Sequence, residues 1–245
     1  GLRLGETTDT QDATGTVLLR SPIESLSEAR IREVVAGFEG RIQQLPPMYS
    51  AVKVGGVPLY KAARAGREVS RQVREVTVFR LDIVDVQIPE VTLRVVCSKG
   101  TYIRTLCADI GDKLGVGGHM ATLVRERVGP LTLEQALTVD EVESRLEQGT
   151  LAASMLTLDQ ALVGLPVCIV GAATAGRVLH GMPVPVSEVL AWHGLSSPLS
   201  GGANRAIRIK DGAGRLLAIG TMPDGMNAEA PGANAQSIAV SKVLV

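Results

Sequence analysis

Aromatic residues are scarce in this sequence, which has two phenylalanines, three tyrosines and one tryptophan among its 245 residues. Aliphatic side chains must therefore fill the interior, and the 45% hydrophobic content is typical of a folded protein rather than a disordered one. Neither a signal peptide nor an apolar run long enough to cross a bilayer is present, which argues against secretion and membrane spanning. The length fits one large domain or two smaller ones.

Cysteine and histidine are also too few to suggest a disulfide framework or a metal centre. The three cysteines are odd in number, lack C-x-x-C spacing and lie in apolar surroundings: Cys97, Cys107 and Cys168. Free thiols in a reducing cytoplasm are therefore expected. The three histidines are scattered along the chain, so no metal site is expected.

Net charge is absent, because 25 basic and 25 acidic residues balance, and the total gives no sign of a nucleic-acid partner. Local charge does give one, because phosphate binding depends on local clusters. One stretch interrupted by glycines contains only two acidic residues, Glu68 and Glu75, but seven basic ones: Lys53, Lys61, Arg64, Arg67, Arg71, Arg74 and Arg80. This stretch is either a solvated loop or a surface that grips phosphates.

The stretch from residue 91 to residue 114 predicts a strand followed by a helix. Its first part is a short apolar run, residues 98–101 interrupt it, and apolar residues then recur at helical spacing. Arg104 falls in the first turn of this helix, where a cation opposes the helix dipole. We therefore expect Arg104 to face a carboxylate or a phosphate. The alternative is an ordinary solvated arginine beside a core tyrosine.

Further elements are expected from spacing and composition. Residues 1–5 begin within a strand pattern without an initiator methionine, which predicts that earlier residues are absent. A helix is expected over residues 27–38, with Ser27 as its N-cap. Short strands are expected at residues 16–19, 76–81, 165–170, 206–210, 215–220 and 237–244, and further helices at residues 61–67, 138–149 and 174–179.

Four segments, in order, resemble the bacterial tRNA pseudouridine-55 synthases. They are LGETTDT at residues 4–10 with Asp12 and Gly15, LPPMYSAVKV at residues 45–54 with Gly56 and Tyr60, SKGTYIRTL at residues 98–106, and LVRERVG at residues 123–129. Together they extend over roughly half of the chain. Each segment alone is weak evidence, but four segments in the same order as in the family make the resemblance specific.

The resemblance implies an α+β fold with a mixed, mainly antiparallel sheet and flanking helices, followed by a small C-terminal β-barrel that is PUA-like. Residues 1–160 would form a pseudouridine synthase catalytic domain that lacks its N-terminal part. An RNA-binding insertion would lie at about residues 45–80. Residues 165–245 would form the PUA-like RNA-binding domain, which matches the family more loosely than the first half.

The resemblance also implies an activity: isomerisation of uridine 55 in the T-arm of tRNA, by base flipping and an aspartate, without metal or cofactor. Arg104 would pair with that aspartate, and Tyr102 and Leu123 would shape the pocket. A cytoplasmic monomer that binds the T-arm stem-loop is expected. The residues expected to contact RNA are Lys53, Lys61, Arg64, Arg67, Arg71, Arg74, Lys99, Arg125 and Arg127.

The nucleophile itself is missing from the sequence. The family carries its aspartate in a Gly-Thr-Leu-Asp-Pro-like motif, and no aspartate here has that context, so the chain alone is expected to be inactive. One alternative is a non-catalytic RNA-binding or tRNA-folding protein derived from the family. Two weaker alternatives are a guide-RNA-dependent synthase, which the basic segment disfavours, and an α/β interaction domain without an RNA role.

Overall fold

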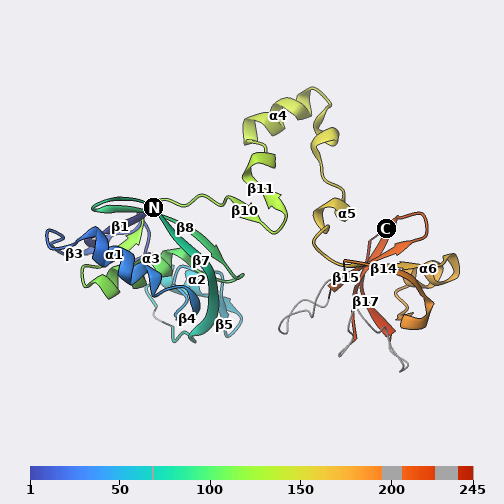
Figure 1. The fold of residues 1–245 in the computed structure, drawn as a ribbon, viewed down its shortest axis with the longest axis horizontal. Helices are drawn as coiled ribbons and strands as arrows, with labels where there is room; N and C mark the ends of the chain where they lie inside the picture. Colours follow the sequence, from blue (N-terminus) through green and yellow to red (C-terminus); the bar gives the residue numbers. More distant parts are fainter. Residues whose placement is uncertain (68, 195–205, 224–236, 245) are drawn as a thin grey trace. The chain divides into compact units, whose positions relative to one another are not determined.

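A computed structural model gives the fold and describes residues 1–67, 69–194, 206–223 and 237–244 (Figure 1). The chain divides into two compact units, Gly1–Val124 and Arg125–Val245. This division lies before the domain boundary that the sequence predicts near residue 160. The assignment of a catalytic domain and a PUA-like domain stays a prediction.

A five-stranded antiparallel sheet forms the centre of the first unit, in the order β4-β7-β8-β1-β9. Its strands are β1 (Leu2–Leu4), β4 (Gly40–Gln44), β7 (Arg74–Gln87), β8 (Glu90–Cys97) and β9 (Gly118–Met120). β7 and β8 form a long hairpin in which Val78 pairs with Cys97 and Gln87 with Glu90. The strand predicted at residue 91 is confirmed. By contrast, the one predicted at residues 76–81 is only part of β7.

Two helices, α1 (Glu28–Ala36) and α3 (Ile103–Leu114), contact each other and pack against this sheet (Figure 1). Ser27 caps α1 as predicted, because its hydroxyl accepts a hydrogen bond of 3.3 Å from the backbone N–H of Arg30. Close packing of α3 on β9 requires a glycine at position 111. A Cβ there would collide with the backbone of Gly117 and Gly118.

The core of the first unit is aliphatic, as the shortage of aromatic residues requires. It includes Leu2 and Leu4 of β1, Ile31 of α1, and Leu106 and Ile110 of α3, each at most 1% exposed. The three cysteines are free in the structure, and burial raises the pKa of Cys107 and of Cys168 to about 12. Both thiols therefore stay protonated at neutral pH.

Between β4 and β7 the chain leaves the sheet for residues 45–73, which we call the insertion. It contains a small hairpin, β5 (Lys53–Val54) with β6 (Val57–Pro58), and the short helix α2 (Leu59–Arg64). Leu59 and Ala62 of α2 are buried and anchor it. A helix was predicted here at residues 61–67, close to the observed one. The insertion leaves and rejoins the sheet at neighbouring points, because Gln44 pairs with Arg74.

The second unit begins with residues 125–165, none of which is buried. Its regular elements are β10 (Arg127–Val128), β11 (Leu131–Thr132), η1 (Leu133–Gln135), α4 (Val139–Glu147), η2 (Leu151–Ser154) and α5 (Leu158–Ala161). The helix predicted from residue 138 is confirmed as α4, which Thr138 and Glu141 cap reciprocally. Within the described parts of the chain, no helix combines the length and apolarity needed to span a membrane.

The remainder of the second unit is a six-stranded sheet in the order β13-β17-β16-β15-β12-β14, with helix α6 (Ala172–Leu179) packed on it. β12 and β15 pair in parallel, and the other pairs are antiparallel. The strands are β12 (Val167–Val170), β13 (Val184–Pro185), β14 (Val189–His193), β15 (Ala206–Asp211), β16 (Leu216–Thr221) and β17 (Ser237–Val243), with the short η3 (Val186–Glu188) before β14. Together with the first unit, this sheet confirms the predicted α+β class.

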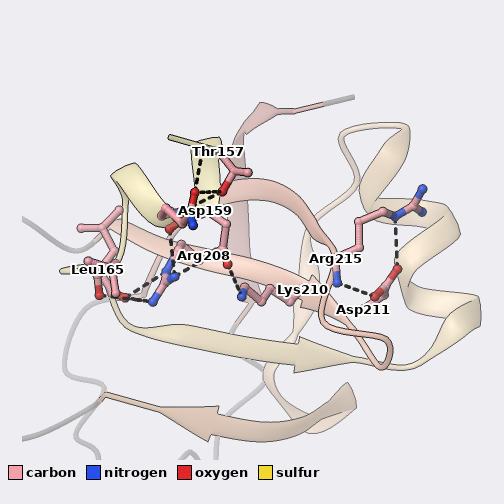
Figure 2. Close-up of polar contacts among 9 residues, drawn as sticks. Thr157, Asp159, Leu165, Arg208, Lys210, Asp211 and Arg215 are labelled. Atoms are coloured by element: carbon pink, nitrogen blue, oxygen red, sulfur yellow. Dashed lines mark hydrogen bonds and ion pairs between the residues drawn. The ribbon is translucent and has the colours of Figure 1, made fainter. Parts of the chain in front are cut away.

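One buried arginine ties the segment around α5 to this sheet (Figure 2). Arg208 of β15 is 8% exposed, and its Nη1 donates to Asp159 Oδ1 at 2.9 Å. Its other donors reach the carbonyl oxygens of Leu165, at 2.9 and 3.1 Å, and of Val163, at 3.3 Å. Lys210 donates to the second carboxylate oxygen of Asp159 at 2.5 Å, and this hydrogen bond, with those from Arg208, lowers the pKa of Asp159.

We predict that Arg208→Met lowers the free energy of unfolding of the second unit by about 2–4 kcal/mol, because the carbonyls of Leu165 and Val163 lose this donor and Asp159 loses one of its two charged donors, with Lys210 remaining. The matched control is Arg215→Met, which removes an exposed arginine paired with Asp211 (Figure 2) and should cost about 0.5 kcal/mol or less. Denaturant unfolding followed by fluorescence of Trp192, the single tryptophan, reports on this unit. Equal losses in the two variants would contradict the prediction.

Candidate active site

The candidate site is centred on Arg104, in the first turn of α3. Its Nη1 lies 3.2 Å from Oδ2 of Asp12, and the two side chains are 28% and 13% exposed. Asp12 comes from the loop between β2 (Glu6–Thr8) and β3 (Val17–Arg20), a two-stranded hairpin. The expectation that Arg104 faces an anion is therefore met by a carboxylate, which offsets the cation at the positive end of the helix dipole.

Asp12 is itself held by the threonines beside it. Its Oδ1 accepts hydrogen bonds from Thr10 Oγ1 at 3.0 Å, from Thr14 N at 3.0 Å and from Thr14 Oγ1 at 2.6 Å. Burial alone would raise the pKa of Asp12, but the bonds from Thr14 and Thr10, with the charge of Arg104, lower it below its usual value. Asp12 is thus an ionised carboxylate whose oxygens are already engaged, which suits a holder of Arg104 better than a nucleophile.

The loop that carries Asp12 is fixed to its neighbours at several points. Met120 of β9 donates its N–H to the Gln11 carbonyl at 3.0 Å and accepts from the Ala13 N–H at 2.9 Å. Thr105 of α3, 2% exposed, donates its hydroxyl to Oε1 of Gln11 at 2.9 Å. Gln11 has a φ of 61°, in the left-handed region. The loop and the first turn of α3 therefore form one connected group.

Tyr102 occupies the N-cap position of α3 and is half-buried. Both of its backbone polar groups are bound by the side chain of Gln44, at the end of β4: Nε2 donates to the Tyr102 carbonyl at 3.2 Å, and Oε1 accepts from its N–H at 3.0 Å. Tyr102 and Arg104 thus lie together at one end of α3. Leu123 follows β9 in a segment without regular structure and is 53% exposed.

Most of the basic residues predicted to bind RNA lie on exposed surface. On the insertion or at its end, Lys53, Lys61, Arg64, Arg67 and Arg74 are exposed, and Lys99 is exposed in the turn before α3. Arg71 differs, because it is half-buried and its Nη1 donates to the Pro46 carbonyl at 3.0 Å. Arg125 and Arg127 are also exposed, but they belong to the second unit.

Sequence reasoning did not find three residues of this site: Asp12 as the partner of Arg104, Gln11 and Gln44. The threonine-rich composition around Asp12 is typical of a loop in which an aspartate binds nearby backbone and hydroxyl groups. This composition was the sequence feature that could have indicated a fixed role for Asp12. No periodicity connects positions so far apart in the chain. Among the described residues, no cluster of three or more His, Cys, Asp or Glu side chains could hold a metal ion.

Comparison with known proteins gives a consistent result. Residues 1–103 match the family model described as TruB family pseudouridylate synthase (N terminal domain), and residues 104–163 match the model described as tRNA pseudouridylate synthase B C-terminal domain. The chain is 43% identical over 225 residues to the tRNA pseudouridine synthase B of Burkholderia mallei (strain NCTC 10247), covering 92% of this chain and 72% of that protein. It is 41% identical to that of Geobacter sulfurreducens (strain ATCC 51573 / DSM 12127 / PCA), covering 86% of this chain and 68% of the relative.

The fold also resembles a solved structure. A chain in the crystal structure of a Cbf5-Nop10-Gar1 complex superposes with a TM-score of 0.70 at 26% sequence identity. The match covers 89% of this chain but only 62% of the Cbf5-complex chain. The chain therefore spans less than two thirds of that structural relative, so what the whole relative does is not transferred by the fold alone.

We predict that Asp12→Asn lowers the free energy of unfolding by about 1–3 kcal/mol at neutral pH, because an amide cannot neutralise Arg104 or accept as many hydrogen bonds. The folded-state pKa of Asp12 lies below its ordinary value of 3.8, so its stabilisation is present above pH 3.8. It is lost as the pH falls through the folded pKa. The difference between wild type and variant should accordingly shrink in acid, as measured by denaturant unfolding at a series of pH values.

The control for this experiment is Asp9→Asn in the same loop. Asp9 is exposed and accepts one backbone hydrogen bond, from Thr16, that an amide oxygen can replace. Burial, aided by Asp112, raises the pKa of Asp109 to about 6. Asp109 titrates alike in wild type and in both variants, so its contribution cancels when their free energies of unfolding are subtracted. A pH-independent loss in Asp12→Asn, or an equal loss in Asp9→Asn, would be the contrary result.

Proposed function

Because the chain belongs to the TruB family of pseudouridylate synthases, we propose that it acts on tRNA and isomerises uridine 55 of the T-arm to pseudouridine. The observation that carries this proposal is the pair formed by Arg104 and Asp12 at the start of α3, with Tyr102 beside it. This arrangement presents a fixed, partly buried cation at one end of a helix. Such a cation can orient a reacting carboxylate.

In the proposed reaction the uridine leaves the folded RNA, because a base inside a T-arm cannot otherwise be reached. An aspartate then assists cleavage of the bond between N1 of the base and C1′ of the sugar, and the base rotates and bonds to C1′ through C5. C5 then loses its proton and N1 gains one, so the reaction is an isomerisation. Arg104 keeps that aspartate ionised and aimed. A guanidinium has five N–H donors, and among the described residues Asp12 pairs with it through Nη1, so donors remain for a second carboxylate.

The other predicted residues have roles that fit where they lie. Tyr102, half-buried at the N-cap, would form a wall of the base pocket, and the exposed Leu123 would close against the flipped base. Lys99 and the exposed cations of the insertion would hold the RNA backbone. These contacts position the RNA, whereas the pocket selects the base.

A second candidate function is a non-catalytic RNA-binding or tRNA-folding role. The observation that favours it is that Asp12, the carboxylate paired with Arg104, already accepts hydrogen bonds from Thr10 and Thr14, which suits a structural role better than that of a nucleophile. The resembled family carries its nucleophile instead in a Gly-Thr-Leu-Asp-Pro-like motif. In this second function, the exposed cations of the insertion and the proposed base pocket bind RNA without turnover. We propose that the chain as given is silent and becomes active when a segment with that motif precedes it.

Pseudouridine formation on a T-arm stem-loop tests this proposal directly. We expect no product from the purified chain and measurable product from a chain extended by the motif-bearing segment. In the extended chain, Arg104→Lys should lose about 100-fold in turnover although the charge is kept, because lysine cannot reproduce the planar fork that aims a carboxylate. The matched control is Arg30→Lys, on the exposed surface of α1, which should retain normal turnover. Product from the unextended chain, or normal turnover in the folded Arg104→Lys variant, would contradict the proposal.

Binding of the same stem-loop should depend strongly on salt, because cations of the insertion displace counterions from phosphates. The double variant Arg64→Ala with Arg67→Ala should reduce the slope of log affinity against log salt by about 0.7–0.9 for each phosphate that these arginines neutralise. The control removes two exposed arginines of α1, Arg30 and Arg32, which are paired with Glu33 and Glu28. Fluorescence anisotropy at several salt concentrations measures the slope, and equal slopes in both variants would remove the insertion from RNA binding.

A further inference from the structure

Gln44 is a buried residue of β4 whose side chain contacts the backbone of Tyr102 in the candidate site. It ends β4, is 1% exposed, and binds both the N–H and the carbonyl of Tyr102, at 3.0 and 3.2 Å. We propose that Gln44 is a positioning residue that fixes the start of α3, so that Tyr102 and Arg104 present a pocket to the flipped base. The inference rests on the proposed function for the identity of the ligand, but not for the contact itself.

The contact controls where α3 begins. Tyr102 is the N-cap, its own side chain makes no capping hydrogen bond, and its carbonyl accepts the helix bond from Leu106 N at 3.0 Å. That carbonyl therefore accepts from Gln44 and from the helix together. A primary amide is the neutral side chain that offers one donor and one acceptor at this spacing, so it can bind both backbone groups of one residue. Removing it would leave the Tyr102 N–H without this acceptor and its carbonyl with the helix bond from Leu106, so the residue before the first turn would be held less firmly.

The same residue lies at the root of the insertion. Gln44 pairs with Arg74 across the β4–β7 ladder, where the insertion leaves and rejoins the sheet. Beyond it, the Pro46 carbonyl accepts a hydrogen bond from Arg71, which closes the base of the insertion. Gln44 thus joins the segment proposed to grip RNA to the helix turn proposed to hold the base. Because its side chain binds Tyr102, which is proposed to line the base pocket, we expect Gln44 to affect recognition of the base more than binding of the phosphates.

The experiment compares two T-arm stem-loops, one with uridine at the target position and one with an abasic ribose there. Both present the same phosphates, so the ratio of their affinities for the full chain isolates recognition of the base. We expect wild type to prefer the uridine RNA by about tenfold, the scale of one stacked base. Gln44→Met, similar in size but unable to form either bond, should abolish this preference while leaving the affinity for the abasic RNA unchanged. Gln43→Met, an exposed neighbour on the same strand, should keep the preference.

A second variant separates positioning from a general loss of folding. In Gln44→Glu a protonated carboxyl can accept from the Tyr102 N–H and donate to its carbonyl, whereas a carboxylate faces that carbonyl with a negative charge. Burial raises the pKa of such a group. The preference for uridine should therefore recover, relative to wild type at each pH, as the pH falls from about 8 to about 5.5. Protection of the Tyr102 amide against hydrogen exchange, compared with wild type at the same pH, should rise over the same range.

The outcomes are distinct. If wild type does not prefer the uridine RNA, the proposed function fails, and the exchange rate of the Tyr102 amide in Gln44→Met still decides whether Gln44 holds this residue. If wild type prefers uridine and folded Gln44→Met does so equally, the positioning role is overturned. It is also overturned if protection of the Tyr102 amide in Gln44→Glu rises in acid while the preference for uridine does not recover.

Discussion

The candidate site depends on neutralising one charge. Arg104 stands where the positive end of the α3 dipole makes an unpaired cation unfavourable, and the buried carboxylate of Asp12 supplies the opposite charge. A buried carboxylate needs hydrogen bonds of its own, and Thr10 and Thr14 donate them. The β2–β3 loop that carries Asp12 is bonded to Met120 of β9, and α3, which carries Arg104, packs closely on β9 at Gly111, so both charges are held by elements that meet at β9.

Elements that are specified by local signals were predicted well. The change from apolar run to helical spacing after residue 97 predicts β8 and α3, and Ser27 and Thr138 cap α1 and α4 as their side chains allow. α4 lies in a segment without any buried residue, so its local capping box was a sufficient signal. Strands that depend on distant partners were missed. β4 contains exposed polar residues and is a strand because it pairs with β7, and β14 is held by β12.

The site could be predicted only in part. The position of Arg104 indicated an anion, because the dipole argument needs nothing beyond the helix itself. The identity of that anion depends on how a loop near residue 12 folds over β9, which no pattern in the sequence specifies. Gln44 was missed for another reason. Glutamine is usually exposed, and here it is buried because the backbone of Tyr102 satisfies both of its polar atoms. Such pairings appear only when the two strands and the helix are placed together.

The interactions that shape this site are also the ones that let the first unit fold. Arg104 needs Asp12, and the start of α3 needs Gln44, whether or not a nucleophile is near, because unpaired buried charges and backbone groups are costly in any folded protein. Under the proposed function, recognition of RNA and chemical turnover would therefore depend on different groups. The insertion carries exposed cations although the whole chain is neutral, and the N-terminal end of α3 is held by contacts within the folded unit. In the proposed reaction, a further carboxylate presented to the free side of the Arg104 guanidinium would supply the chemistry, while these contacts would supply the binding.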